Sequence, residues 1–152
     1  MATYKSKAVQ SYRPAINSCQ AGEVRTVRGE IDLAADVGGA LALNDILEMV
    51  KLPAEHVPVD CVIDSDDLDS NGTPLISLTG GLTAGTVAEL VAANTVARAG
   101  GVARMDAVAG VRLAATAADR VVGLKVTAAP ATGAVTGKVG FTLSYRAAGY
   151  DD

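Results

Sequence analysis

One histidine and two cysteines are the residues of this chain whose types most often carry acid–base, nucleophilic or metal chemistry. A Ser–His–Asp or Cys–His pair would have to use His56, which lies between two prolines in LPAEHVP, and no G-x-S-x-G segment occurs. A zinc site needs closely spaced Cys or His ligands, and Cys19, His56 and Cys61 include no such pair. We therefore expect no enzyme activity and no metal centre. We expect Cys61 to be a small buried residue.

An acidic turn, DSDDLDSN at Asp64–Asn71, is the second place where chemistry is conceivable. The segment DLDSNG that begins at Asp67 follows the start of the calcium-loop pattern D-x-[DN]-x-[DN]-G. The position that should hold the bidentate glutamate is Leu78, so the segment is not an EF-hand. Three interpretations remain: a solvated turn held by local hydrogen bonds, a weak cation site, or a contact with a basic partner segment.

Signatures of phosphate, nucleic-acid and membrane binding are missing from the sequence. Gly80-Gly81 lacks the Lys-Ser/Thr of a phosphate-binding loop, and Gly100-Gly101 follows a candidate helix instead of opening one. The net charge is −4, and the 13 basic residues form no stripe. No apolar run approaches the ~20 residues of a membrane helix. We expect no cofactor, no nucleic-acid partner and no membrane contact. Since the first residues also lack a signal-peptide core, we expect synthesis in the cytoplasm.

The first 22 residues resemble an arm and contain the best candidates for partner contact. The segment 1–22 carries three basic residues, no acidic residue and two of the four tyrosines, and it shows no sustained periodicity. An arm with aromatic anchors and positive charge can lie over its own domain or reach a neighbour, whereas a plain terminus usually frays. The candidate contact residues are Tyr4, Lys5, Lys7, Tyr12 and Arg13.

The elements that must position any such surface are predominantly β-strands. Apolar and polar residues alternate with a period of two, which is typical of half-buried strands. The segments with this pattern or with short apolar runs are 27–33, 57–63, 75–78, 121–128 and 138–146. The segment 40–52 fits both a strand and a helical face, and we favour a strand. Pro58 cannot donate to a ladder, so it predicts an edge strand or a strand start.

Two more local predictions follow from turn and cap residues. The strands 57–63 and 75–78, separated by an Asn-Gly-containing turn, predict a hairpin with a long loop. Thr86–Ala99 is the one candidate helix, because apolar residues recur there with helical spacing and Glu89 follows Thr86 by three positions, as in a capping box. We therefore predict a single short helix in an otherwise β-rich chain.

Composition restricts the fold further. Alanine, valine and glycine account for 63 of the 152 residues, tryptophan is absent, and Phe141 is the only phenylalanine. The core must therefore consist of small and β-branched side chains. Several short strands with Gly/Pro punctuation predict an all-β, antiparallel sandwich or barrel. The expected organisation is an N-terminal arm at 1–22, one β-sandwich domain at 23–147 and a short tail at 148–152.

Four segments resemble the head decoration, or cement, proteins of tailed bacteriophages. The longest is ALNDILEMVKLPAEHVPVDCVIDSDDLDSNGTP, from Ala42 to Pro74. The others are AGGVAR from Ala99, ADRVVGLKV from Ala118 and GKVGFTLSYR from Gly137. The resemblance covers most of residues 23–147, and it lies in the overall pattern because these proteins have no catalytic motif.

The resemblance implies a β-sandwich of the jelly-roll type and a structural role in the virion. It implies a protein on the outer capsid surface that bridges neighbouring major capsid proteins and forms small homo-oligomers, with a dimer favoured. Two alternatives remain open: a tail or head-fibre component of the virion, or a module that binds carbohydrate or a host surface. The absence of tryptophan disfavours carbohydrate binding, because sugar platforms usually need exposed aromatic rings.

Overall fold

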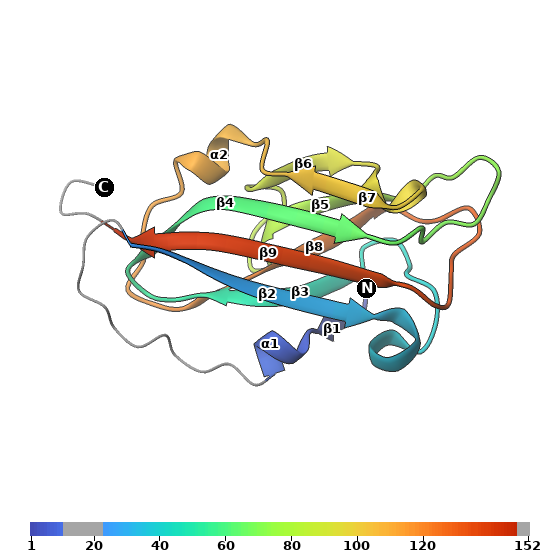
Figure 1. The fold of residues 1–152 in the computed structure, drawn as a ribbon, viewed down its shortest axis with the longest axis horizontal. Helices are drawn as coiled ribbons and strands as arrows, with labels where there is room; N and C mark the ends of the chain where they lie inside the picture. The colour runs from blue at the N-terminus through green and yellow to red at the C-terminus, as the bar shows by residue number, and fades with distance from the viewer. Residues whose placement is uncertain (11–22, 149–152) are drawn as a thin grey trace.

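The computed structural model describes residues 1–10 and 23–148, which form two β-sheets packed face to face with short helices at their margins (Figure 1). The strands are β1 Thr3–Lys5, β2 Val24–Asp32, β3 Ile46–Leu52, β4 His56–Ser65, β5 Ser77–Leu82, β6 Val91–Asn94, β7 Gly101–Arg104, β8 Arg120–Ala128 and β9 Lys138–Ala147. The helical segments are α1 Lys7–Gln10, a π-helical turn at Leu33–Val37, a 3₁₀ turn at Val96–Arg98 and α2 Val108–Val111. The all-β sandwich is confirmed.

The strand order identifies the sandwich as a jelly roll. One sheet has the order β2-β9-β4-β7, and the other has the order β1-β3-β8-β5-β6. The pairs β2·β9, β3·β8, β4·β7 and β5·β6 are nested in the sequence and alternate between the sheets, as in a long hairpin rolled into two layers. Every pairing is antiparallel except that of β1, which adds to β3 in parallel.

The core lies between the sheets and consists of the inward residues of each alternating strand. Along β9, Phe141, Leu143 and Tyr145 are buried while Thr142, Ser144 and Arg146 are half-buried, as the period-2 pattern predicts. Cys61 is also buried, as expected. The largest fully buried side chains are those of Phe141, Ile31, Leu33, Leu47, Met49, Leu52, Ile63, Leu68, Ile76, Leu78, Leu90 and Leu124. Aliphatic residues thus fill nearly all of the core.

The predicted helix at Thr86–Ala99 is wrong. The segment contains the strand β6 and the 3₁₀ turn at Val96–Arg98. The hydrogen bond expected of a capping box forms, because the Thr86 amide donates to Glu89 Oε1 at 3.1 Å. The other carboxylate oxygen accepts from the amides of Leu82 and Ala88, and Val87 has a positive φ of 58°. Glu89 therefore closes a tight turn between β5 and β6, and the backbone leaves helical geometry at once.

The predicted hairpin of strands 57–63 and 75–78 is also wrong. Both strands exist, but β4 belongs to the four-stranded sheet and β5 to the other sheet. The acidic turn therefore crosses from one layer to the other. Pro58 lies near the start of β4, beside an irregularity in the pairing with β9 and outside the stretch paired with β7. The prediction of a strand start is confirmed.

The strand favoured at 40–52 is confirmed for its second half. β3 begins at Ile46, and the preceding residues form a loop with Asn44 at a positive φ of 68°. No helix among the described residues is long and apolar enough to span a bilayer.

Candidate interaction surfaces

The N-terminal residues form the edge of the five-stranded sheet. Residues 3–5 pair in parallel with residues 46–48 of β3, and the Ala2 amide donates to Asp45 Oδ1 at 2.8 Å. Tyr4 lies opposite Leu47 and packs against the core, so its ring faces the protein interior. Tyr4 is therefore an anchor for β1 in this chain.

A polar contact and a glycine fasten the segment that follows β1. Ser6 is fully buried, and its hydroxyl donates to the Met49 carbonyl. Gly29 of β2 lies against the same carbonyl and against Ser6 Oγ, where a Cβ atom would collide with both. The small residue lets β2, β3 and the chain before α1 approach closely. Val9 of α1 is buried beside them.

The basic candidates near the N-terminus are exposed. Lys5 Nζ lies 3.4 Å from Glu48 Oε2, an ion pair on the outer side of the sheet edge. Lys7 is exposed at the start of α1 and lines an open groove of about 410 Å³ together with the outer residues of β2 and the π-helical turn. Tyr12, Arg13 and Cys19 lie outside the described residues. The structure thus brings Tyr4, Lys5 and Lys7 to one edge but turns Tyr4 inward.

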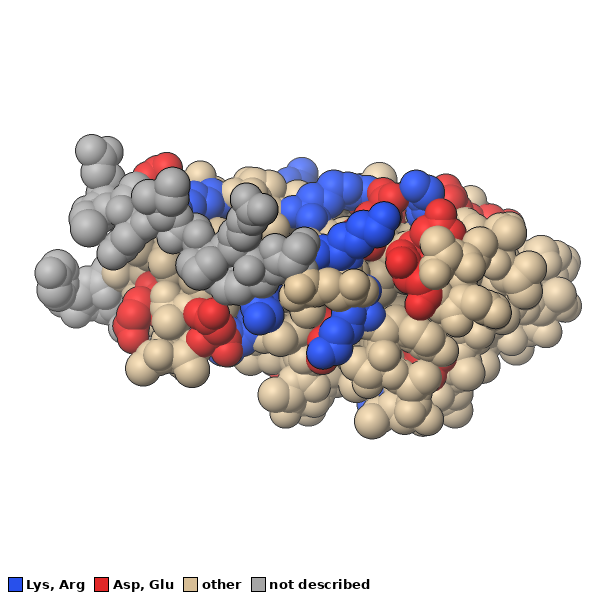
Figure 2. Space-filling view, turned by 90° about the horizontal axis from the view of Figure 1, so that it is seen from below, with Lys and Arg blue, Asp and Glu red and all other residues tan. Residues whose placement is uncertain are grey.

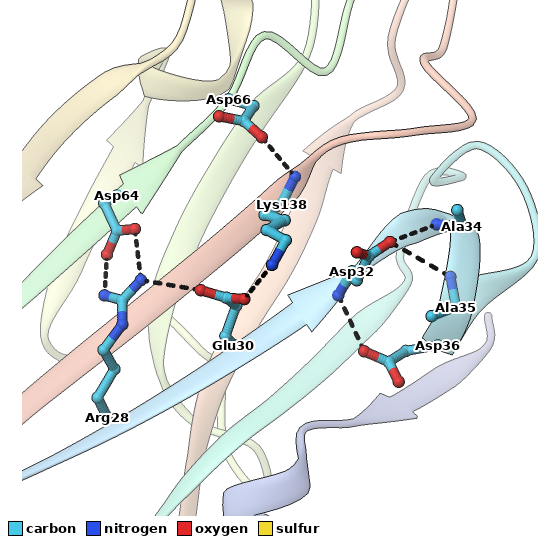
Figure 3. Close-up of polar contacts among 9 residues, drawn as sticks. All are labelled: Arg28, Glu30, Asp32, Ala34, Ala35, Asp36, Asp64, Asp66 and Lys138. Atoms are coloured by element: carbon cyan, nitrogen blue, oxygen red, sulfur yellow. Dashed lines mark hydrogen bonds and ion pairs between the residues drawn. The ribbon is translucent and has the colours of Figure 1, made fainter.

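A second surface, which sequence reasoning missed, is the charged outer face of the sheet β2-β9-β4-β7. Seen from the side of β1 and α1, Lys and Arg side chains gather over the middle of the molecule beside Asp and Glu (Figure 2). We call the set Arg28, Glu30, Asp64 and Lys138 the charge ladder. Arg28 of β2 pairs through both terminal nitrogens with Asp64 of β4, and Glu30 lies 3.3 Å from Arg28 and 2.8 Å from Lys138 Nζ (Figure 3).

Gly140 explains how the charge ladder spans three strands. β9 lies between β2 and β4, and Gly140 pairs with Glu30 on one side and with Asp64 on the other. A Cβ atom at Gly140 would meet both the Arg28 guanidinium and the Asp64 carboxylate. The glycine therefore leaves a path by which Arg28 crosses the central strand. An isolated glycine in an alternating strand is the sequence signal for such an approach.

The charge ladder shifts the titration of its members. The hydrogen bond from Arg28 lowers the pKa of Asp64, and that from Lys138 lowers the pKa of Glu30. Reciprocally, Asp64 raises the pKa of Arg28, and Glu30 raises the pKa of Lys138. All four side chains are about 40–55% exposed, so solvent screens these pairs and their contribution to stability is small. The ladder presents balanced, mutually fixed charges.

The carboxylates of the acidic turn accept hydrogen bonds within the protein. Asp66 Oδ2 accepts from the Lys138 amide at 2.8 Å, and Asp67 Oδ1 accepts from the Asp69 amide at 3.0 Å. Asp69 itself is buried and accepts four backbone amides, from Leu75, Ile76, Ala131 and Thr132. The turn is thus held by hydrogen bonds, as in the first interpretation, but Asp69 is buried instead of solvated, and half of these bonds come from Ala131, Thr132 and Lys138, far from the turn in sequence. Within residues 1–10 and 23–148, no group of three His, Cys, Asp or Glu side chains could hold a metal ion.

His56 and Cys61 occupy structural positions. His56 Nδ1 lies 2.7 Å from the Ala54 carbonyl oxygen, and its ring meets that of Tyr145 edge-on at 5.4 Å. The His56 carbonyl accepts a hydrogen bond from Arg120 Nη2. Burial raises the pKa of the Cys61 thiol to about 12, which keeps the sulfur protonated and weakly nucleophilic at neutral pH.

Comparisons with known proteins agree with a structural role. No family model and no curated protein matches the chain. Among solved structures, a chain of the Ralstonia phage GP4 capsid is 37% identical, with a TM-score of 0.84 over 97% of this chain and 99% of that chain. A chain of the cyanophage Pam1 capsid asymmetric unit is 26% identical, with a TM-score of 0.71 over 93% and 96% of the two chains. A chain of the acid-stable capsid of Helicobacter pylori bacteriophage KHP30 shares the fold, with 13% identity and a TM-score of 0.58 over 84% and 90%.

The jelly-roll fold and these matches together define the class as structural proteins of phage capsids. The chain belongs to the family of phage capsid proteins that includes the matched chain of Ralstonia phage GP4. It is thus a virion protein, and its relatives are structural proteins instead of enzymes.

Proposed function

We propose that this chain is a decoration protein that binds the outer surface of a phage capsid and bridges neighbouring major capsid proteins. The observation that carries the proposal is the near-complete overlap, 97% of this chain and 99% of the other, with a chain of the Ralstonia phage GP4 capsid. The two chains therefore share one fold over almost all of the residues compared. The four segments that resemble cement proteins support the same role.

The physical mechanism is preferential binding to the assembled shell. A protein that binds assembled capsid better than free subunits stabilises the assembled state by linkage. Each copy needs only a modest contact, because many copies act on one particle. The rigid sandwich suits this task, since little conformational entropy is lost when preformed surfaces dock.

The N-terminal edge is the proposed contact with the major capsid protein. Lys5 and Lys7 are exposed there, and Tyr12 and Arg13 follow in the chain. We also propose that the chain acts as a small homo-oligomer, with a dimer favoured. A bridging protein needs at least two separate contacts, so the N-terminal edge would be one of several.

An add-back experiment tests the function. Purified protein is titrated onto capsids that lack it, and the copy number at saturation and the melting temperature of the shell are measured. Saturation at hundreds of copies with a raised melting temperature is the expected result. Absence of binding would contradict the proposal. A count of only a few copies in intact particles would instead favour a tail or head-fibre component.

A further inference from the structure

One end of the jelly roll is formed by three loop segments that carry no charged residue. They are residues 38–44, 70–76 and 129–137, which belong to the connections from β2 to β3, β4 to β5 and β8 to β9, and the charged residues of these connections lie outside the segments, at Asp36, Asp45, Asp66, Asp67 and Asp69. We call them together the uncharged end. They lie at the right of Figure 1, and the corresponding end of Figure 2 shows neither Lys or Arg nor Asp or Glu. Lys138 of the charge ladder directly follows the third segment, so the charged face begins where the uncharged end stops.

The three loops contact one another and form a single unit. The Ser70 amide donates to the Thr132 carbonyl at 3.0 Å, and Asn71 Nδ2 donates to Thr132 Oγ1 at 3.0 Å. Gly133 lies so close to Ala40 that a Cβ atom on the glycine would be 2.5 Å from the Ala40 Cβ. The first and third loops are therefore in contact, and the second is hydrogen-bonded to the third.

Two buried carboxylates at the base of the loops hold this unit in place. Asp69 accepts amide hydrogens from the second loop, at Leu75 and Ile76, and from the third loop, at Ala131 and Thr132. Asp45 is 3% exposed and accepts the amide of Ala42 in the first loop. Hydrogen bonds to ionised acceptors are about twice as strong as neutral ones. The loops are thus fixed without any charge at their surface.

Each loop exposes one large apolar side chain. Leu43, Leu75 and Val135 are 51%, 52% and 60% exposed, and each belongs to a different loop. When a partner covers apolar side chains that are already fixed, little conformational entropy is lost. Because the surface is uncharged, no charged group has to give up its water. An isolated apolar residue at a surface is ordinary. Three on a unit held by buried carboxylates indicate a surface that another protein covers.

We propose that the uncharged end docks on an apolar, uncharged patch of the assembled capsid shell. This inference rests on the proposed decoration function and assigns one of its contacts. A second copy of the chain is a poorer occupant, because a stable dimer buries about 800 Å² on each partner. Three half-exposed side chains at a narrow end fall well short of that area. A contact of this size is sufficient where many copies bind one shell.

The test compares two sets of three substitutions in the full chain. The first set changes the uncharged end by Leu43→Ser, Leu75→Ser and Val135→Ser. The matched control changes three valines on β7 and α2 that are somewhat more exposed, by Val102→Ser, Val108→Ser and Val111→Ser. Both proteins and the wild type are titrated onto capsids that lack the protein. Melting of the free proteins shows that each variant folds, and sedimentation gives the oligomeric state of each.

We expect binding to the shell to weaken at least about ten-fold for the first set and to stay near the wild-type value for the control. Wild-type affinity for the first set, or an equal loss in both sets, would overturn the inference and leave the decoration function intact. If the wild type is an oligomer and the variant with the first set is a monomer, the uncharged end contacts a second copy, and the inference is overturned as well. If the wild type itself fails to bind shells, the proposed function fails, and the inference fails with it.

Discussion

Asp69 shows how one residue can fix two loops. Burial alone would raise the pKa of its carboxyl group, but the amides of Thr132, Ala131, Leu75 and Ile76 outweigh that effect and lower it. The carboxylate is therefore ionised across the physiological range, and all four amides find an acceptor. An orphaned buried amide is costly, which makes this residue hard to replace.

The substitution Asp69→Asn tests this role. The NH2 group of asparagine faces backbone N–H groups that need an acceptor, so either the one bond to Oδ1 or the three bonds to Oδ2 are lost. We expect a clear fall in melting temperature. In the control Asp67→Asn, the single bond to the Asp69 amide can be kept by the side-chain oxygen, and the melting temperature should change little. Equal melting temperatures of the two variants would contradict the assigned role.

Gly140→Ala tests the path of Arg28 across β9. The added methyl group meets the Arg28 guanidinium, and overpacking of this kind costs about 1–3 kcal/mol. The free energy of unfolding is measured by denaturant titration. Gly72→Ala is the control, because nothing lies within 4 Å of the added atom. The loss in free energy of unfolding caused by Gly140→Ala should be smaller when Arg28 is also replaced by alanine. An unchanged loss would show that the Arg28 guanidinium is not what the added methyl group meets.

At the scale of the element, β1 attaches the N-terminus to the sandwich through Tyr4. We expect Tyr4→Ala to lower the free energy of unfolding by about 1–3 kcal/mol, because a partly buried aromatic ring leaves the core. Lys7→Ala should change the free energy of unfolding by less than about 0.5 kcal/mol, since the side chain is exposed. Similar values for both variants, measured by denaturant unfolding, would show that β1 does not depend on its tyrosine.

The strands that the sequence predicts well are those whose two faces differ. Over most of their length β4 and β9 alternate between buried and half-buried residues, so their period is visible without any partner. The helix at Thr86–Ala99 failed because a local signal, Thr86 with Glu89, stabilises a turn as readily as a helix start. The hairpin failed because a strand pattern does not encode the sheet to which the strand belongs, and the turn between β4 and β5 changes layer.

Some features of the candidate surfaces could be predicted from the sequence, and others depend on how the strands pair. The basic residues Lys5 and Lys7 were predictable as exposed because they lie in a polar, basic segment. The inward direction of Tyr4 was not, because it depends on the register of β1 with β3. The charge ladder was invisible in the sequence, since Arg28 and Asp64 are neighbours only when β9 lies between β2 and β4. Long-range strand order is what the sequence pattern lacks.

At the scale of the whole molecule, the charge ladder predicts a loss of stability in acid. The pKa values of Asp64 and Glu30 are lower in the folded state, so the unfolded state binds protons first as the pH falls. Their contribution is complete above the unfolded pKa values of about 4 and disappears as the pH drops through the folded values. We expect the stability difference between the wild type and Asp64→Asn/Glu30→Gln to be flat from about pH 5 to 8.

Below about pH 4 this difference should shrink, because the wild-type carboxyl groups lose the charge that the variant lacks. Urea unfolding across the pH range measures this stability difference, and its amplitude should be small because solvent screens the exposed pairs. A stability difference between the wild type and the variant that persists at pH 2 would show that it comes from packing and not from charge. Asp67→Asn is a suitable control, since no salt bridge of Asp67 is found among the described residues.

The central position of β9 in the four-stranded sheet has a consequence for folding during synthesis. β9 pairs with both β2 and β4, yet it follows every other described strand in the sequence. The four-stranded sheet therefore cannot close while residues 138–147 are still inside the exit tunnel, and β2 waits with an unpaired edge for more than 100 residues of synthesis. Pairing over such sequence distances is slow and exposes strands to aggregation. A chain interrupted before residue 138 would therefore leave an open half-sandwich, because β2 and β4 would both lack the strand that joins them.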